Sequence, residues 1–378
     1  MKKVYISGAL RTPLGIYQGS LAGLSEQKLA AMTMLGLIEK TGVIPAAIDE
    51  IVIGNSKQTS TPSNLARHAM LEAGLPVEIP AYTVQRQSAS GLQAIINGYL
   101  SIKSDCAEVI LAGGSESMSQ IPLEIRNARY VFGADTEIIF DPVANQLAGA
   151  QPSETYGKLT MEAITDNIAK HYGIAAADVE AYLADEAKKE AKTSASLLPV
   201  EVKKKKAVET VAADKCYAKL PAIARPADGA AVCLLCSEEA AAKQKLPVVG
   251  ELLGIAFEAG SPVCAGAFET NVITQAVEKA GLALPDIDYF EITEFSAVQM
   301  IAAKKVLQTL GLTEKDIEAK VNSAGGALTT GLAWGTCGAA MLTDLIDKLQ
   351  IEKRNYGMII TPAEGGQTLA VVVKTINK

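Results

Sequence analysis

Three glycine-containing loops carry the residue types that could do chemistry. The first is segment 84–92, where Ser88 and Ser90 precede a glycine at the expected start of a helix. A nucleophile in such a turn gains from the helix dipole, which stabilises a developing negative charge. The competing interpretation is that Ser88 or Ser90 only caps the helix. The residue types alone leave both interpretations open.

The other two loops lie near the C-terminus. Segment 321–335 is glycine-rich and contains Leu332, and segment 362–367 reads Pro-Ala-Glu-Gly-Gly-Gln, with Glu364 as its charged residue. Repeated glycines let a backbone pass close to a ligand or to another chain, although turns alone would explain them as well. We therefore treat both loops as candidate parts of a site.

An internal repeat indicates how these loops are positioned. Segment 36–53 aligns without a gap on segment 275–292, and Gly42 and Gly281 each end a helical pattern that precedes a short apolar strand. Each copy is followed by another helix and another apolar strand, at 109–112 and at 358–360. This alternation predicts an α/β fold on mixed, mostly parallel sheets, with functional groups in loops after the strands.

The two similar halves enclose an insert. We assign residues 1–119 and 221–265 to the N-terminal half, 120–220 to an inserted loop or lid domain, and 266–378 to the C-terminal half. The insert is charged, and 175–196 has an alanine-rich amphipathic helical pattern. The apolar run 230–236 is expected to return as a strand to the first half.

Composition narrows the class of protein. A chain of 378 residues that is 49% hydrophobic and 20% charged is globular, and a net charge of -7 argues against a nucleic-acid-binding surface despite the basic run 203–206. No apolar run approaches the ~20 residues of a membrane span, and no signal sequence is evident, so we expect no membrane association and a cytoplasmic location. Cys233 and Cys236 lie inside an apolar strand, so no metal site is predicted.

The loops and several further blocks, in this order, resemble the thiolase superfamily, whose members make and break carbon–carbon bonds between acyl-CoA thioesters. The supporting blocks are 11–13, 64–67, 112–119, 228–231 and 291–294. The resemblance implies a thiolase-like fold and an acyl-CoA thioester as substrate or ligand, with no other cofactor. It also implies a homodimer or homotetramer.

The family's catalytic positions are substituted in this chain. The nucleophilic cysteine is replaced by Ser88, the activating histidine by Leu332 and the second cysteine by Pro362. Thr293 replaces an asparagine, while the glutamate after it is retained as Glu294.

Two further positions differ. Glu364 replaces the first glycine of a triplet, and Ala224, followed by Arg225, stands in the segment where the family places a CoA-contacting serine.

These substitutions change the expected chemistry. Shuttling an acyl group between thiols needs a thiolate, whereas a serine hydroxyl requires an adjacent base, which Leu332 cannot be. The resemblance therefore predicts an acyl-CoA acyltransferase-like protein whose ordinary thiolase activity is very weak or altered. If Glu294 and Glu364 lie beside Ser88 in one pocket with Leu332 and Pro362, they could support different acyl-CoA chemistry. The alternative is a non-catalytic homologue that binds acyl-CoA or serves as partner subunit of an active thiolase.

Overall fold

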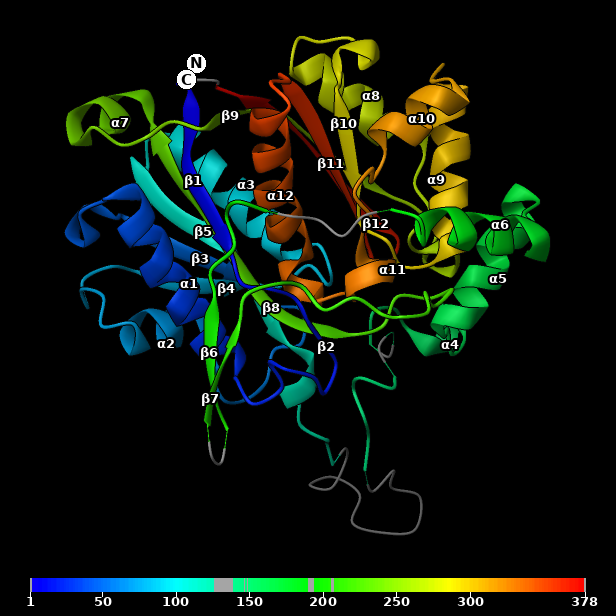
Figure 1. Ribbon diagram of the computed structural model, residues 1–378, viewed down its shortest axis with the longest axis horizontal. Helices are drawn as coiled ribbons and strands as arrows, with labels where there is room; N and C mark the ends of the chain where they lie inside the picture. Colours follow the sequence, from blue (N-terminus) through cyan, green and yellow to red (C-terminus); the bar gives the residue numbers. More distant parts are fainter. Residues whose placement is uncertain are drawn as a thin grey trace.

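The computed structural model describes residues 2–125, 139–145, 147, 149–189, 194–204 and 207–376. Its strands (Figure 1) are β1 (Val4–Arg11), β2 (Gly15–Ile16), β3 (Glu50–Gly54), β4 (Ala81–Val84), β5 (Val109–Ser117), β6 (Val200–Lys204), β7 (Ala207–Val211), β8 (Ala227–Ser237), β9 (Gly250–Ala259), β10 (Tyr289–Ile292), β11 (Tyr356–Ala363) and β12 (Gln367–Thr375).

Its α-helices are α1 (Glu26–Thr41), α2 (Leu65–Glu72), α3 (Ser90–Lys103), α4 (Ser153–Tyr156), α5 (Met161–Tyr172), α6 (Ala176–Glu186), α7 (Glu238–Gln244), α8 (Thr270–Lys279), α9 (Ala297–Thr309), α10 (Glu314–Lys320), α11 (Ala327–Thr330) and α12 (Cys337–Ile351).

One mixed sheet joins the two halves. Its strand order is β10-β11-β12-β9-β1-β8-β5-β3-β4, and β2 pairs with β8. The α/β class is confirmed, but parallel pairing is less extensive than expected, since among the strands of the described residues only β10–β11, β3–β4 and β3–β5 are parallel. The remaining pairs are antiparallel. For β11 and β12 the reason is the three-residue connection 364–366, because a parallel pair needs a longer crossover.

The hydrophobic core is arranged in layers around this sheet. α1 and α2 pack on the outer face of β1, β3, β5 and β8, whereas α3 and α12 lie between the two halves of the sheet. α8 and α9 cover the outer face of the C-terminal half. This layering brings the strand-end loops of both halves toward the central helices.

The internal repeat is visible in the structure. α1 ends at Gly42 and α8 is followed by Gly281, with nearly the same left-handed φ angles, 69° and 70°. α1 is followed by the short strand β3, which pairs in parallel with β5. α8 is followed by the short strand β10, which pairs in parallel with β11. The repeat therefore corresponds to one α/β unit used twice.

The insert contains more than the helices that its sequence indicated. α4, α5 and α6 are present, but β6 and β7 also form an antiparallel hairpin. Val200 and Val202 bury one face of that hairpin against Leu21 and Leu29. The alternation of valine and charged residues from 200 to 204 was the overlooked signal. Lys203 and Lys204 end β6, and the rest of the basic run lies outside the described residues.

The boundary between the halves stays a prediction, since β9 connects them. It pairs along its length with β12, while Gly250 and Glu251 also pair with β1. As expected, β8 returns to the first half and lies between β1 and β5. Among the described residues, no helix has the length and apolar character needed to cross a membrane.

Candidate functional site

Ser88 lies in the turn between β4 and α3. Gln87 has a left-handed backbone with φ of 49°, which is uncommon for a residue with a side chain. Ser90 closes the turn, because its Oγ accepts from the N–H of Arg86 at 2.8 Å and donates to the carbonyl of Gln87. The Ser88 hydroxyl is not used in this turn and reaches the opposite half of the molecule.

Ser88 is paired with Glu364. Its Oγ donates to Oε2 of Glu364 at 2.8 Å, and its N–H donates to the same oxygen at 3.1 Å. Ser88 is fully buried and Glu364 is 4% exposed. The carbonyl of Pro362 is a second, longer acceptor for Ser88 Oγ at 3.4 Å. The structure thus unites Ser88, Pro362 and Glu364.

The turn between β11 and β12 places Glu364. Gly365 and Gly366 follow it, both with a left-handed φ of 79°, a conformation that glycine adopts without strain. Around the Glu364 side chain lie apolar residues of the insert and of the C-terminal half: Leu147, Met161, Ile164, Ala265 and Phe295. The hollow that they line together with Glu364 has no room for a water molecule.

A thiol lies beside Ser88, although not at either cysteine position of the family pattern. Sγ of Cys337 donates to the carbonyl oxygen of Ser88 at 2.9 Å and lies 3.7 Å from Oγ1 of Thr293. Burial raises the pKa of the Cys337 thiol to about 12, so it stays protonated at neutral pH. Sequence reasoning did not place Cys337 in the site, and the glycine on each side of Thr336-Cys337 was the available signal.

Glu294 has a different set of partners. Its carboxylate accepts from Nδ2 of Asn322 and from the N–H of Leu328, both at 2.8 Å, and it is 1% exposed. Burial, followed by the neighbouring Glu186, raises the pKa of Glu294. Because both donors belong to the glycine-rich segment 321–335, Glu294 holds that loop in place. Among the described residues, no hydrogen bond joins Glu294 to Ser88 or Glu364.

The five residues expected in one pocket are divided between two places. Glu294 and Leu332, together with Thr293 and Cys337, line a small cavity of about 60 Å³, and neither Ser88 nor Glu364 lines it. Cys337 connects the two groups, because it touches Thr293 on one side and Ser88 on the other. Ser88, Pro362 and Glu364 meet as expected, whereas a single pocket that also includes Glu294 and Leu332 stays a prediction.

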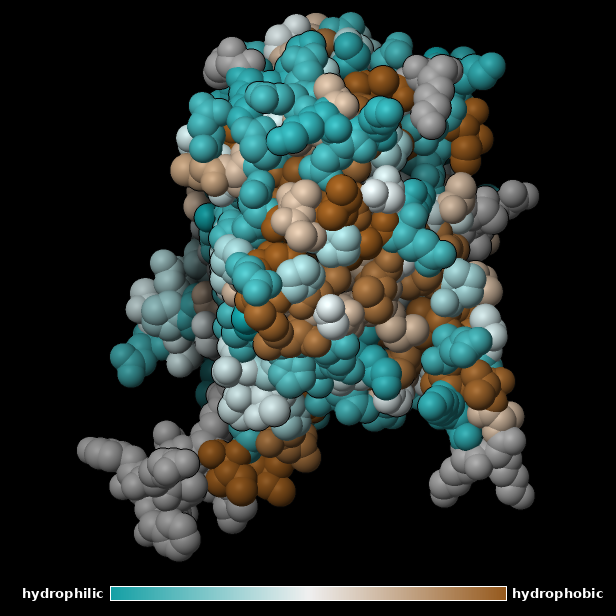
Figure 2. All heavy atoms as spheres, turned by 90° about the vertical axis from the view of Figure 1, so that its left-hand side faces the viewer, coloured by the Kyte–Doolittle hydropathy of each residue, from teal (hydrophilic) through white to brown (hydrophobic). Residues whose placement is uncertain are grey.

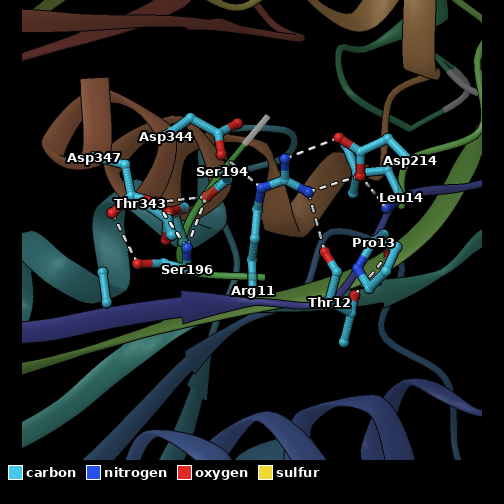
Figure 3. Close-up of polar contacts among 12 residues, drawn as sticks. Arg11, Thr12, Pro13, Leu14, Ser194, Ser196, Asp214, Thr343, Asp344 and Asp347 are labelled. Carbon is cyan, nitrogen blue, oxygen red and sulfur yellow. Dashed lines mark hydrogen bonds and ion pairs between the residues drawn. The ribbon is translucent and has the colours of Figure 1, made fainter. Parts of the chain in front are cut away.

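Two carboxylates that line this cavity, Asp214 and Asp344, belong to a buried ion-pair cluster around Arg11 (Figure 3). Nε of Arg11 donates to Oδ1 of Asp344 at 2.7 Å. The two terminal guanidinium nitrogens of Arg11 donate to the two carboxylate oxygens of Asp214 at 2.7 and 2.8 Å. Arg11 is 1% exposed. The cluster ties the end of β1 to α12 and to the last part of the insert.

The segment expected to contact CoA runs alongside the same loops. The N–H of Ala224 donates to the carbonyl of Phe295 at 2.9 Å, and the N–H of Leu332 donates to the carbonyl of Arg225 at 2.7 Å. The exposed Arg225 guanidinium lies over the ring of Tyr217 at 5.0 Å. In the described part of the chain no cluster of three or more His, Cys, Asp or Glu side chains could hold a metal ion.

Two similar α/β halves with paired strand-end loops and an insert define a thiolase-like fold. The chain matches the thiolase N-terminal domain over residues 4–224 and the thiolase C-terminal domain over residues 246–375. It therefore belongs to the thiolase family.

Similar proteins cover nearly the whole chain. It is 30% identical to the mitochondrial 3-ketoacyl-CoA thiolase of Rattus norvegicus, over 99% of this chain and 98% of that protein. The crystal structure of human mitochondrial 3-ketoacyl-CoA thiolase superposes with a TM-score of 0.89 at 28% identity, covering 99% of both chains. A second structure of that human protein, in complex with CoA, has a TM-score of 0.87 at 27% identity and covers 99% of this chain and 98% of that one.

Proposed function

We propose that this thiolase-family protein binds acyl-CoA thioesters and has very weak thiolase activity or none. The ligand class rests on the family and on the similar human structure that contains CoA. The loss of ordinary activity rests on one observation: the buried hydroxyl at the nucleophile position is hydrogen-bonded to the buried Glu364.

The chemistry of the site supports this proposal. Thiolysis requires a group that is both a good nucleophile and a good leaving group, which a thiolate is and a serine alkoxide is not. The nearby Cys337 cannot substitute, because burial keeps it as a thiol. Losing catalytic residues that act as a unit typically costs on the order of 10⁴ to 10⁶ in rate. Leu332 and Pro362 stand where the family has its activating histidine and its second cysteine, so these two acid–base groups are missing as well.

Two measurements on the same purified protein test the proposal. Calorimetry with CoA and acetyl-CoA is expected to show binding, and a thiolysis assay with acetoacetyl-CoA is expected to show little or no turnover. Leu332→His restores one family residue and, with Glu364 still in place, is expected to stay inactive. Thiolysis within about a hundredfold of an ordinary thiolase would refute the proposal, because that loss is well short of the one expected above. Failure of both CoA compounds to bind would also refute it.

The Ser88–Glu364 contact favours one other function, hydrolysis of an acyl-CoA. Ser88 Oγ would attack the thioester carbonyl while Glu364 accepts its proton, CoA would leave as its thiol, and water would release the acid from the acyl-serine. This function predicts a slow release of CoA that both Ser88→Ala and Glu364→Gln abolish. If the release persists in both variants, the pair has no such role.

Assembly and location are further proposals. The family resemblance favours a homodimer or homotetramer, and a role as partner subunit of an active thiolase is the other arrangement we consider. A cytoplasmic location is also proposed, whereas the similar rat thiolase is a mitochondrial protein. Purification from cells of origin, with identification of any co-eluting thiolase, would separate the two arrangements.

A further inference from the structure

We propose that Glu364 is an occluding residue: its carboxylate occupies the two Ser88 donors that would otherwise bind the carbonyl oxygen of a thioester. This inference rests on the proposed acyl-CoA ligand and adds to it. It predicts that the protein binds the CoA part of its ligand while excluding the acyl group from Ser88.

The donor geometry is the first support. The N–H and the Oγ of Ser88 converge on one oxygen of Glu364, at 3.1 and 2.8 Å. Two donors directed at one oxygen are an arrangement that can bind the carbonyl oxygen of an intact thioester. Here the protein supplies that oxygen itself, so a ligand carbonyl and Glu364 compete for the same donors.

The packing around Glu364 is the second support. Leu147, Met161 and Ile164 of the insert, together with Ala265 and Phe295, surround the side chain and leave no room for a water molecule. All five are at least nine-tenths buried. An acyl group that approaches Ser88 from the side of these five residues would therefore have to displace the Glu364 side chain.

The hydrogen-bond partners of Glu364 are the third support. The hydrogen bonds of this carboxylate to described residues come from Ser88, and no ion pair accompanies them there. A buried acceptor oxygen stays with the donors that it has, because leaving donor and acceptor unpaired away from water is costly. Closure of the site is thus the stable arrangement.

Ligand binding distinguishes occlusion from an open site. The wild-type protein should bind CoA and acetyl-CoA with equal affinity, since the acetyl group gains no contact at Ser88. Glu364→Ala should bind acetyl-CoA about tenfold or more tightly than CoA, because one hydrogen-bonded oxygen is worth about 1.4 kcal/mol. Glu364→Gln fills the same space and should behave like the wild type. Equal affinities in Glu364→Ala would overturn the proposal.

A second measurement does not depend on CoA binding. The thiol introduced by Ser88→Cys should react slowly with iodoacetamide, followed by peptide mass spectrometry at position 88. Adding Glu364→Ala should accelerate the reaction at least about tenfold, whereas adding Glu364→Gln should not, since both remove the charge but only Ala opens space. Glu364 has no left-handed backbone, so Ala is compatible there, and Glu364→Ser serves if Ala fails to fold.

The outcomes separate the two proposals. Suppose that CoA binds neither the wild type nor Glu364→Ala, but that Glu364→Ala accelerates alkylation of the cysteine at position 88. The acyl-CoA function then fails and occlusion stands. If Gln accelerates the reaction as much as Ala, charge rather than occupancy controls access, and occlusion is wrong. If neither substitution accelerates it, another element closes the site and occlusion is also wrong.

Discussion

Cys337 and Ser88 are in direct contact: the Cys337 thiol donates to the Ser88 carbonyl oxygen at 2.9 Å. The contact fixes the start of α12 against the turn before α3. The contact also directs the Cys337 thiol to a backbone carbonyl oxygen and not to the Ser88 side chain. Proximity of a cysteine to the nucleophile position therefore does not supply the missing thiolate.

The first prediction concerns this thiol. At neutral pH iodoacetamide should modify the exposed Cys106 and Cys216 and leave Cys337 unmodified, because Cys337 is buried and its pKa is raised to about 12 by that burial. Peptide mass spectrometry after timed exposure measures each site. Alkylation of Cys337 as fast as of Cys106 would mean that the wall next to Ser88 opens in solution.

The second prediction concerns the buried ion pairs of Arg11. Arg11→Met should lower the free energy of unfolding by about 3–5 kcal/mol, because it leaves the buried carboxylates of Asp214 and Asp344 without their Arg11 partner. Urea unfolding measures the change. Lys188→Ala is the control, since its pair with Asp185 has side chains 74% and 73% exposed and should matter by less than about 1 kcal/mol. Equal effects would show that the Arg11 cluster is not structural.

The third prediction uses Glu116, which links the halves by accepting from the N–H groups of Ser56 and Gly335, both at 2.8 Å. Burial raises the pKa of Glu116 from an ordinary value of 4.5 to about 7. Between these two values the folded protein keeps a proton that the unfolded chain has released, so this group lowers stability as pH rises through the window.

Glu116→Gln removes that titration. The stability advantage of the wild type over this variant should therefore shrink by at least about 1 kcal/mol between pH 4.5 and pH 7.5, given about 1.4 kcal/mol per pKa unit. Urea unfolding of both proteins at the two pH values measures it. A constant or growing advantage would show that Glu116 is ionised throughout.

The fourth prediction concerns assembly. In the described part of the chain β4 is an edge strand, and beside it Tyr82, Asn97 and Leu100 line a shallow depression in which Leu100 is 51% exposed. Figure 2 also shows apolar side chains gathered over the middle of the face on the α1 and α2 side. Edge strands and apolar patches favour association, so light scattering should give a mass of two or four times 39.6 kDa.

Substitutions can locate the interface. Leu100→Asp should shift the protein toward the monomer, whereas Ile351→Asp, at the end of α12 and 66% exposed, should leave the assembly unchanged. A stable wild-type mass near 39.6 kDa at micromolar concentration would exclude the assembly. Equal effects of both variants would place the interface elsewhere.

The sequence by itself determined the fold class, the repeat and the family. These depend on local patterns, such as Gly42 and Gly281 ending equivalent helices and apolar runs forming β3 and β10, and such patterns are read without knowing what packs against them. It also determined that the thiol, histidine and second thiol of the family are absent, because Ser88, Leu332 and Pro362 stand in recognisable blocks.

Only the tertiary structure decided which groups meet. Ser88 and Glu364 are separated by 276 residues, and their hydrogen bond exists because α3 and α12 pack between the halves and align the β4–α3 turn with the β11–β12 turn. The same packing inserts Cys337 between Ser88 and Thr293 and leaves Glu294 with the glycine-rich loop. Such contacts depend on how whole elements fit together in space, and spacing along the chain does not specify that fit.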